Sequence, residues 1–201
     1  MKLILASASP RRRELLQQIG LSFIVRPADS EPDVSGLSPE ETVQAIALGK
    51  ARSVAAESAA DDLILAADTL VYLDGQPLGK PKSPDEAAAM LQALSGREHH
   101  VCTGVALLQG PRCLVSCEKT AVRFRPLSPE RIAAYVASGE PMDKAGAYGI
   151  QGLGCLLVEG ITGDYFNVVG LPLGLVSDML ARFGYPVLNE HTAPKAEQEL
   201  S

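Results

Sequence analysis

The sequence predicts one α/β domain with a mixed sheet flanked by helices. Short apolar runs typical of buried strands alternate along the chain with segments whose apolar residues recur at helical spacing. The dipeptide Asp74-Gly75 is typical of a tight turn between antiparallel strands. A chain of 201 residues with 46% hydrophobic residues is long enough for one substantial core. We therefore expect a single domain over residues 1–188.

The elements follow in order from these two patterns. The expected strands, each a short apolar run, cover residues 2–6, 23–26, 63–67 with its continuation at 70–73, 99–108, 113–125 and 155–159. The expected helices, each with an apolar face, cover residues 10–19, 39–58, 83–94, 129–137 and 173–183. A proline-rich acidic loop at 27–37 and a glycine-rich passage at 143–154 connect them. The polar tail at 189–201 is expected to be disordered.

The overall charge and the composition exclude several classes of partner. With 18 basic and 24 acidic residues the net charge is −6, which argues against general binding to nucleic acid or an anionic membrane. We find neither a signal peptide nor an apolar run of membrane-spanning length. The four cysteines lack disulfide or zinc spacing, so we expect reduced thiols in a cytoplasmic protein.

Four of the expected helices begin after a Ser-Pro pair, and one of them is unlike the rest. The pairs start at Ser9, Ser38, Ser83 and Ser128. Serine caps a free N–H group, and proline at the first helical position has none to lose. The last three helices carry acidic residues in their first turn, which complement the helix dipole, and those after Ser38 and Ser83 fit a capping box.

The first helix carries Arg11, Arg12 and Arg13 at that place instead. Each cation there opposes the dipole by roughly 0.3–1 kcal/mol, so stability alone does not favour the arrangement. Free N–H groups, a serine hydroxyl and several guanidinium groups together form an anion site suited to phosphate. The alternative is a solvated basic helix face. The sequence lacks the glycines of a P-loop or a dinucleotide fingerprint.

Other candidate groups are weaker when taken alone. Asp68 follows a buried run, where a carboxylate at the end of a strand can bind metal or accept a proton from water; alternatively it starts a turn. Lys50 and Lys80 offer cations for phosphates, or are ordinary surface lysines. Gln151, in the glycine-rich passage, can pair with a base edge, or belongs to a flexible connector.

Taken together, these segments resemble the Maf family of nucleotide pyrophosphatases. The matching pieces, in order along residues 2–183, are Leu5-Ala6-Ser7-Ala8-Ser9-Pro10-Arg11-Arg12, Gly49-Lys50-Ala51, Ala67-Asp68-Thr69, Gly79-Lys80-Pro81, Ser95-Gly96, Thr103-Gly104-Val105, Ala145-Gly146-Ala147-Tyr148-Gly149-Ile150-Gln151-Gly152 and Val169-Gly170-Leu171-Pro172. The Ala-Tyr-Gly-Ile-Gln-Gly form resembles the branch that acts on dTTP and UTP. The resemblance implies a Maf/ITPase-like elongated sheet with two lobes and a central cleft, a Mg²⁺ or Mn²⁺ ion, and a homodimer as the family's expected assembly.

The resemblance also implies roles for individual residues. Asp68 would be the catalytic proton acceptor, and Arg11, Thr69 and Gln151 would set substrate specificity. The remaining implied phosphate ligands are Ser9, Arg12, Lys50 and Lys80. The family's second metal ligand is a glutamate in the acidic loop after the second strand, where this chain has Asp29-Ser30-Glu31-Pro32. We assign that role to Glu31, with Asp33 in reserve and Asp68 as the other ligand.

The expected reaction is hydrolysis of a nucleoside triphosphate to the monophosphate and pyrophosphate, by water attack at the α-phosphate. Two alternatives stay open. One is a nucleotide-binding regulator, for instance of cell division, that does not depend on turnover. The other is a pyrophosphatase that prefers 7-methyl-GTP.

Overall fold

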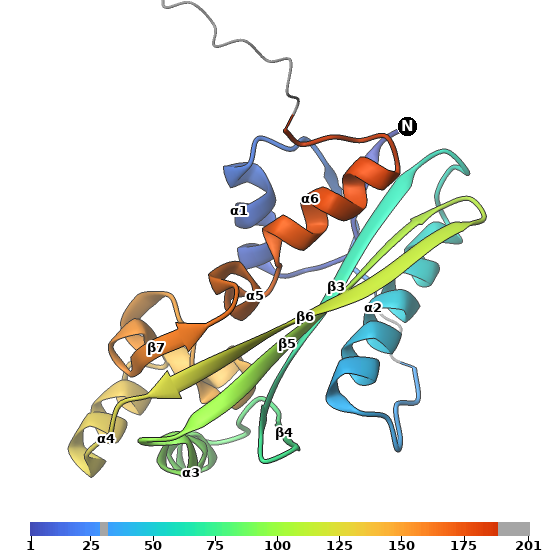
Figure 1. Cartoon of the computed structure of the whole chain (residues 1–201). Helices are drawn as coiled ribbons and strands as arrows, with labels where there is room; N and C mark the ends of the chain where they lie inside the picture. Colours follow the sequence, from blue (N-terminus) through green and yellow to red (C-terminus); the bar gives the residue numbers. More distant parts are fainter. Residues whose placement is uncertain (29–31, 189–201) are drawn as a thin grey trace, which may run out of the picture.

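A computed structural model describes residues 1–28 and 32–188 of the chain. The apolar runs pair into one seven-stranded sheet in the order β2-β1-β3-β5-β6-β7, with β4 paired to β3 (Figure 1). The strands are β1 (Leu3–Leu5), β2 (Ile24–Val25), β3 (Leu63–Leu73), β4 (Gln76–Leu78), β5 (Glu98–Gln109), β6 (Arg112–Phe124) and β7 (Val158–Thr162). β1 is parallel to β2 and β3, whereas β3, β5, β6 and β7 pair antiparallel, so the prediction of a mixed sheet is confirmed.

Six α-helices and three short 3₁₀ helices surround the described part of this sheet. The α-helices are α1 (Pro10–Gln18), α2 (Pro39–Ala55), α3 (Pro84–Leu94), α4 (Pro129–Ala137), α5 (Tyr165–Val169) and α6 (Leu173–Arg182). The 3₁₀ helices are η1 (Glu140–Asp143), η2 (Ala145–Ala147) and η3 (Gly152–Leu156). The capping box at the start of α2 is complete. At α3 the box is incomplete, because the Glu86 carboxylate accepts from the backbone N–H of Lys82 rather than from that of Ser83.

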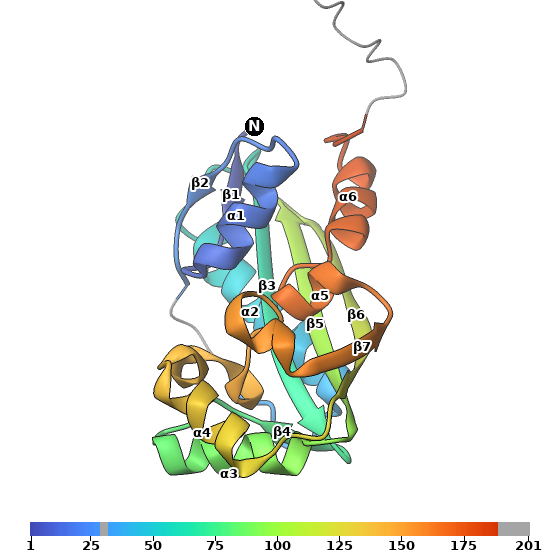
Figure 2. The same cartoon turned by 90° about the vertical axis from the view of Figure 1, so that its left-hand side faces the viewer.

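Both faces of β1 and of the first part of β3 are covered, which explains why residues 3–5 and 63–67 are apolar throughout. Leu5 and Leu65 pack with α1 and α6 on one face, while Ile4 and Ile64 pack with α2 on the other. Figure 2 shows the same layers, with α2 behind the sheet and α1, α5 and α6 in front of it. A further apolar cluster lies between α3, α4 and the far ends of β3, β5 and β6.

Three details differ from the expectations. Asp68 does not end a strand, because β3 continues through it and pairs it with Gly104 of β5. The strand expected at 155–159 is wrong over its first residues, since η3 extends to Leu156 and β7 begins at Val158. The short elements β4 and α5 were not expected. The Asp74-Gly75 turn is confirmed, with both residues at positive φ, as a tight hairpin of this twist requires.

Among the described helices none is long and apolar enough to cross a bilayer. The expected disorder at 189–201 concerns residues outside those described, and the single domain over 1–188 stays a prediction.

Candidate active site

The start of α1 differs from the three other helices that follow a Ser-Pro pair. The hydroxyls of Ser38, Ser83 and Ser128 each accept a hydrogen bond from a backbone N–H group in the first turn. Within residues 1–28 and 32–188, the Ser9 hydroxyl makes no such capping bond. The amino end of α1 therefore keeps N–H groups available for an anion, as the placement of its arginines predicts.

Of the three arginines, Arg12 is turned into the protein. It is 9% exposed, and its Nε donates to the carbonyl of Gly170 at 2.8 Å. Its Nη1 donates to the carbonyl of Ala67 at 2.8 Å and to the hydroxyl of Ser7 at 3.2 Å, and its Nη2 donates to Thr69 at 3.0 Å. Four of the five guanidinium N–H groups thus have protein acceptors, which leaves one for a ligand.

Arg12 is a charged group that joins three parts of the chain: α1, β3 and the segment after α5. Burial lowers the pKa of its guanidinium, while the nearby Asp68 carboxylate opposes that shift. An arginine remains protonated in spite of such a shift. A fixed positive charge therefore lies in the cavity wall near Asp68.

Asp68 and Lys50 form an ion pair in which Lys50 Nζ donates to Asp68 Oδ1 at 2.8 Å. The two side chains are 20% and 19% exposed, so the pair is shielded but still reaches the cavity. The pairing of β1 with β3 stops at Leu65, and β4 pairs with β3 only from Val71 onward, so the edge of β3 between these two points has no strand paired to it on the β1 side. Asp68 lies in that part of β3, where its carboxylate is accessible.

A close approach between α2 and β5 brings Lys50 to this position. Gly104 lies opposite Asp68 in the sheet register, and a Cβ atom there would overlap the backbone carbonyl of Val43 in α2. Ala47 and Ala51, both fully buried, continue the same small-residue contact along the helix. Lys50 follows Val43 by two helical turns and therefore shares its face.

One cavity of about 720 Å³ brings the predicted residues together. Its lining includes Ser9, Arg11, Arg12, Lys50, Asp68, Thr69, Lys80 and Gln151. This volume is in the range of small-molecule and cofactor sites. Arg13 is exposed and is not part of the lining, and Glu31 lies outside the described residues. Asp33, the reserve metal ligand, is described but does not line the cavity, and its carboxylate accepts from Ser35 instead. The roles of the lining residues stay predictions, but they all lie at a single site.

The hydroxyl of Thr69 is hydrogen-bonded to other groups of the protein. It accepts from Arg12 at 3.0 Å and lies 3.0 Å from the hydroxyl of Thr103, which in turn donates to the carbonyl of Asn167 at 3.0 Å. Thr69 is therefore held in a chain of hydrogen bonds that runs from α1 to α5. Gln151, by contrast, is exposed at the opposite wall of the cavity.

Sequence reasoning missed Glu140 and did not single out Asp143 or Lys144, although all three line the cavity. Arg11 Nη1 lies 3.6 Å from Asp143 Oδ2, so the amino end of α1 is linked to η1 across the cleft. The hydrogen bond from Lys144 is the main cause that holds the pKa of Asp143 below its ordinary value. No spacing in the sequence marks these residues.

Among the described carboxylates of the cavity, Asp68 is the one with an oxygen available for a divalent cation. No group of three or more His, Cys, Asp or Glu side chains within the described residues is placed to hold a metal. Glu140 and Asp143 are already bound by donors of the protein, whereas Asp68 uses only Oδ1 in its ion pair. Mg²⁺ is commonly held by one or two carboxylates together with substrate phosphates and water. Asp68 with a bound triphosphate fits that pattern.

Comparisons with known proteins show the family of the chain. The chain matches the family model described as "Maf-like protein" over residues 2–183. It is 59% identical over 189 residues to a "dTTP/UTP pyrophosphatase" of Moorella thermoacetica, covering 92% of this chain and 97% of the relative. A protein of Symbiobacterium thermophilum with the same description is 54% identical over 187 residues, covering 92% and 96%.

A solved HAM1 protein from Coxiella burnetii shares the fold, with a TM-score of 0.51 at 19% identity, covering 90% of this chain and 99% of that one. The likeness confirms the expected α/β architecture. Since the family match extends over residues 2–183 and includes every described residue of the predicted site, this protein belongs to the Maf family.

Proposed function

We propose that this protein is a nucleoside triphosphate pyrophosphatase that hydrolyses dTTP and UTP to the monophosphate and pyrophosphate. The observation that carries the proposal is the single cavity in which the Asp68–Lys50 pair lies beside the arginine-bearing end of α1. The relatives described as dTTP/UTP pyrophosphatases, at 59% and 54% identity, support the choice of nucleotides.

The reaction begins with attack of water on the α-phosphorus. A P–O bond forms to the water oxygen as the bond to the α–β bridging oxygen breaks, and pyrophosphate leaves. Asp68 accepts the proton of the attacking water. Lys50 holds the Asp68 carboxylate through one N–H and has two further N–H groups that can donate to the phosphates.

The cations of the cavity stabilise the negative charge of the departing pyrophosphate. Arg11 and Lys80 line the cavity and can donate to phosphate oxygens, and Arg12 adds a fixed charge with one remaining N–H. The Ser9 hydroxyl and the N–H groups at the start of α1 complete the anion site.

A divalent cation, Mg²⁺ or Mn²⁺, would be held by Asp68 and the triphosphate, with Glu31 as the proposed second carboxylate. It would neutralise phosphate charge and so lower the barrier to attack.

Gln151 is the proposed reader of the base. A primary amide has both donor and acceptor atoms, which match the N3–H and O4 groups of uracil and thymine. Arg11, across the cleft, is the second specificity residue. Thr69 is proposed to contribute by fixing Arg12, because its hydroxyl is committed to Arg12 and Thr103.

Release of pyrophosphate from a panel of triphosphates tests the proposal. The panel contains dTTP, UTP, dCTP, CTP, GTP and 7-methyl-GTP, each assayed with Mg²⁺, with Mn²⁺ and with EDTA. We expect dTTP and UTP to give the highest kcat/KM and EDTA to suppress turnover. A preference for 7-methyl-GTP, or nucleotide binding without turnover of any substrate, contradicts the proposal.

The cellular setting is part of the proposal. All four cysteines are free, which agrees with a reducing compartment, and we place the protein in the cytoplasm. A homodimer is the proposed assembly, and light scattering of the purified protein gives the mass that tests it.

A further inference from the structure

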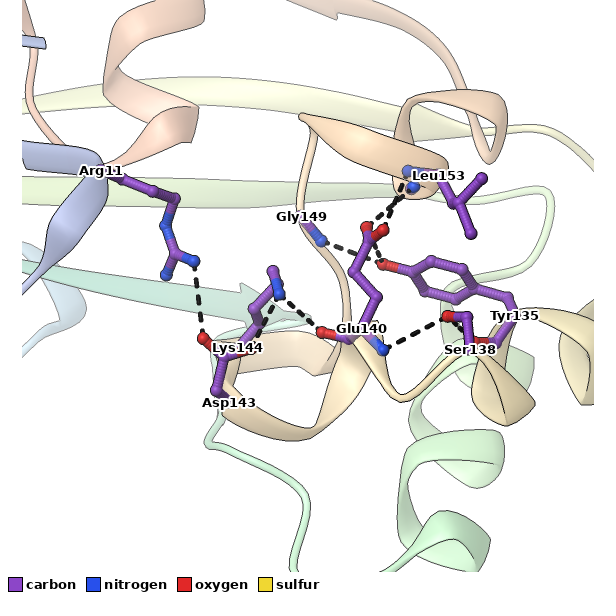
Figure 3. A network of polar contacts seen from close by, with 9 residues as sticks. Arg11, Tyr135, Ser138, Glu140, Asp143, Lys144, Gly149 and Leu153 are labelled. Carbon is purple, nitrogen blue, oxygen red and sulfur yellow. Dashed lines mark hydrogen bonds and ion pairs between the residues drawn. The ribbon is translucent and has the colours of Figure 1, made fainter. Parts of the chain in front are cut away.

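The side chain of Glu140 binds the backbone of the segment that carries Gln151 (Figure 3). Its Oε2 accepts from the backbone N–H of Leu153 at 2.9 Å. Its Oε1 accepts from the backbone N–H of Gly154 at 3.0 Å. Both partners follow Gln151 within three positions, so the carboxylate fixes the carboxyl-terminal side of this segment.

The hydroxyl of Tyr135 extends the same contact to the other side of Gln151. It donates to Glu140 Oε1 at 2.8 Å and accepts from the backbone N–H of Gly149 at 3.3 Å. One glutamate and one tyrosine thus hold Gly149, which precedes Gln151, and Leu153 and Gly154, which follow it. Figure 3 shows the contacts at Gly149 and Leu153. The side chain of Gln151 is exposed, so packing against other side chains does not fix its position.

The glycines of the segment allow this close approach. A Cβ atom on Gly152, which has φ +63°, would lie 2.8 Å from Glu140 Oε2. A Cβ atom on Gly154 would lie 2.7 Å from the Tyr135 hydroxyl and would overlap the carbonyl of Gly149. The backbone between residues 149 and 154 can therefore lie against the Glu140–Tyr135 pair only without side chains at these places.

The carboxyl group of Glu140 is held in its ionised form, which accepts hydrogen bonds through both oxygens. Burial acts to raise the pKa of its carboxyl, but the hydrogen bonds from Leu153, Tyr135 and Gly154 together lower it below the ordinary value. The carboxylate is therefore ionised at neutral pH and accepts from all three donors at once.

The residues next to Glu140 connect it to the other specificity candidate. Lys144 Nζ donates to the Glu140 carbonyl at 2.6 Å and to Asp143 Oδ1 at 2.7 Å. Asp143 in turn lies 3.6 Å from Arg11. Residues 140–144 thus contact both Arg11 and the segment of Gln151.

From this geometry we propose that Glu140, with Tyr135, is a positioning residue for base selection: it fixes the backbone of residues 149–154 so that the Gln151 amide meets the pyrimidine edge. The inference rests on the proposed function, in which Gln151 reads the base. Glu140 itself contacts neither the base nor the reacting phosphate in this scheme.

The test measures kcat and KM for UTP and for GTP in the full-length protein. In Glu140→Gln the new NH₂ group faces backbone donors, so at least one of the hydrogen bonds is lost. We expect the ratio of kcat/KM for UTP to that for GTP to fall about tenfold, mainly through a higher KM for UTP. Tyr135→Phe removes the hydrogen bonds of the hydroxyl to Glu140 and Gly149 but leaves those of Glu140 to Leu153 and Gly154, and it is expected to lower the ratio by about threefold.

Glu40→Gln is the matched control. Glu40 also accepts from a tyrosine hydroxyl, that of Tyr72 at 3.2 Å, and it pairs with Lys119, but it does not line the cavity. The substitution removes the same charge and the same kind of contact, and we expect the UTP-to-GTP ratio to stay within about twofold of the unmodified protein.

Gln151→Leu, alone and combined with Glu140→Gln, separates this inference from the function on which it rests. If Glu140 acts through Gln151, the ratio in the double variant equals that in Gln151→Leu. Additive effects, or an equal fall in kcat for both nucleotides, overturn the positioning role. If Gln151→Leu leaves the ratio unchanged, the proposed base reader is wrong and the inference fails with it. Should Glu140→Gln not fold, an unchanged ratio in Tyr135→Phe overturns the inference.

Discussion

Lys50 Nζ lies 2.8 Å from Asp68 Oδ1, and this ion pair links α2 to the middle of β3 at the floor of the cavity. The lysine keeps the carboxylate in one orientation, while the unpaired edge of β3 between Leu65 and Val71 gives water access to it. The proposed role of Asp68 as proton acceptor rests on this fixed orientation and on its place at the cavity.

Replacing Asp68 by Asn tests that role. The amide cannot accept the proton of the attacking water, so we expect kcat to fall at least about 100-fold. Its oxygen can still accept from Lys50, so the free energy of unfolding is expected to fall by no more than about 2 kcal/mol. Pyrophosphate release and urea unfolding measure the two effects. Asp178→Asn, on the exposed face of α6, is the control; near-normal turnover in Asp68→Asn contradicts the assignment.

Arg12 and its neighbour Arg13 give a matched pair for stability. Lysine cannot reproduce four hydrogen bonds in fixed directions, so Arg12→Lys is expected to lower the free energy of unfolding by about 2–4 kcal/mol. Arg13 is exposed, and Arg13→Lys should change the free energy of unfolding by less than about 0.5 kcal/mol. Denaturant titration of both variants measures the difference. Equal effects mean that the buried contacts of Arg12 add nothing.

The sequence could predict which segments form this site but not the hydrogen bonds that hold its side chains in place. The comparison of four Ser-Pro helix starts predicted an anion site at α1, and the missing Ser9 cap agrees with it, because capping chemistry is local. The inward orientation of Arg12 depends on Gly170, which is 158 positions away, and on the sheet position of Thr69. Glu140 left no trace in the sequence because two of its partners are backbone N–H groups, which any residue except proline provides.

The helices and strands likewise fall into those that the sequence predicts and those that it does not. Long elements with a clear period, such as α2 and β5, could be predicted because their patterns extend over many residues. The strand expected at 155–159 was wrong because Cys155 and Leu156 belong to a 3₁₀ helix whose turn begins at Gly152. A run that short has no period of its own, and its contacts decide its conformation.

Gly104→Ala is expected to destabilise the protein and to impair the site together. The added methyl group overlaps the backbone of Val43, so α2 must move away from β5 at a cost of about 1–3 kcal/mol or more. The same movement separates Lys50 from Asp68, so kcat should fall even where the variant is fully folded. Gly160→Ala in β7 is the control, because no atom lies within 4 Å of its added Cβ. Unchanged kcat in folded Gly104→Ala contradicts this coupling.

His99 makes stability depend on pH in a defined window. It is 1% exposed, its Nε2 lies 2.7 Å from the Tyr148 hydroxyl, and its Nδ1 has no partner among the described residues. Burial lowers the pKa of His99 from 6.5 to about 4. Between pH 6.5 and pH 4 the His99 side chain is therefore protonated in the unfolded chain but neutral in the folded protein. The free energy of unfolding falls as the pH decreases through this range.

Between pH 7 and pH 5 this effect amounts to about 2 kcal/mol of the free energy of unfolding. The window lies above the range in which lowered carboxyl pKa values, such as that of Glu140, begin to contribute. Urea unfolding at the two pH values measures the loss, which should disappear in His99→Phe. It should persist in His100→Gln, because that half-buried neighbour stacks on Tyr72 outside the aromatic cluster of His99. A pH dependence that survives in His99→Phe must come from another group, and the neutral buried histidine is then not its cause.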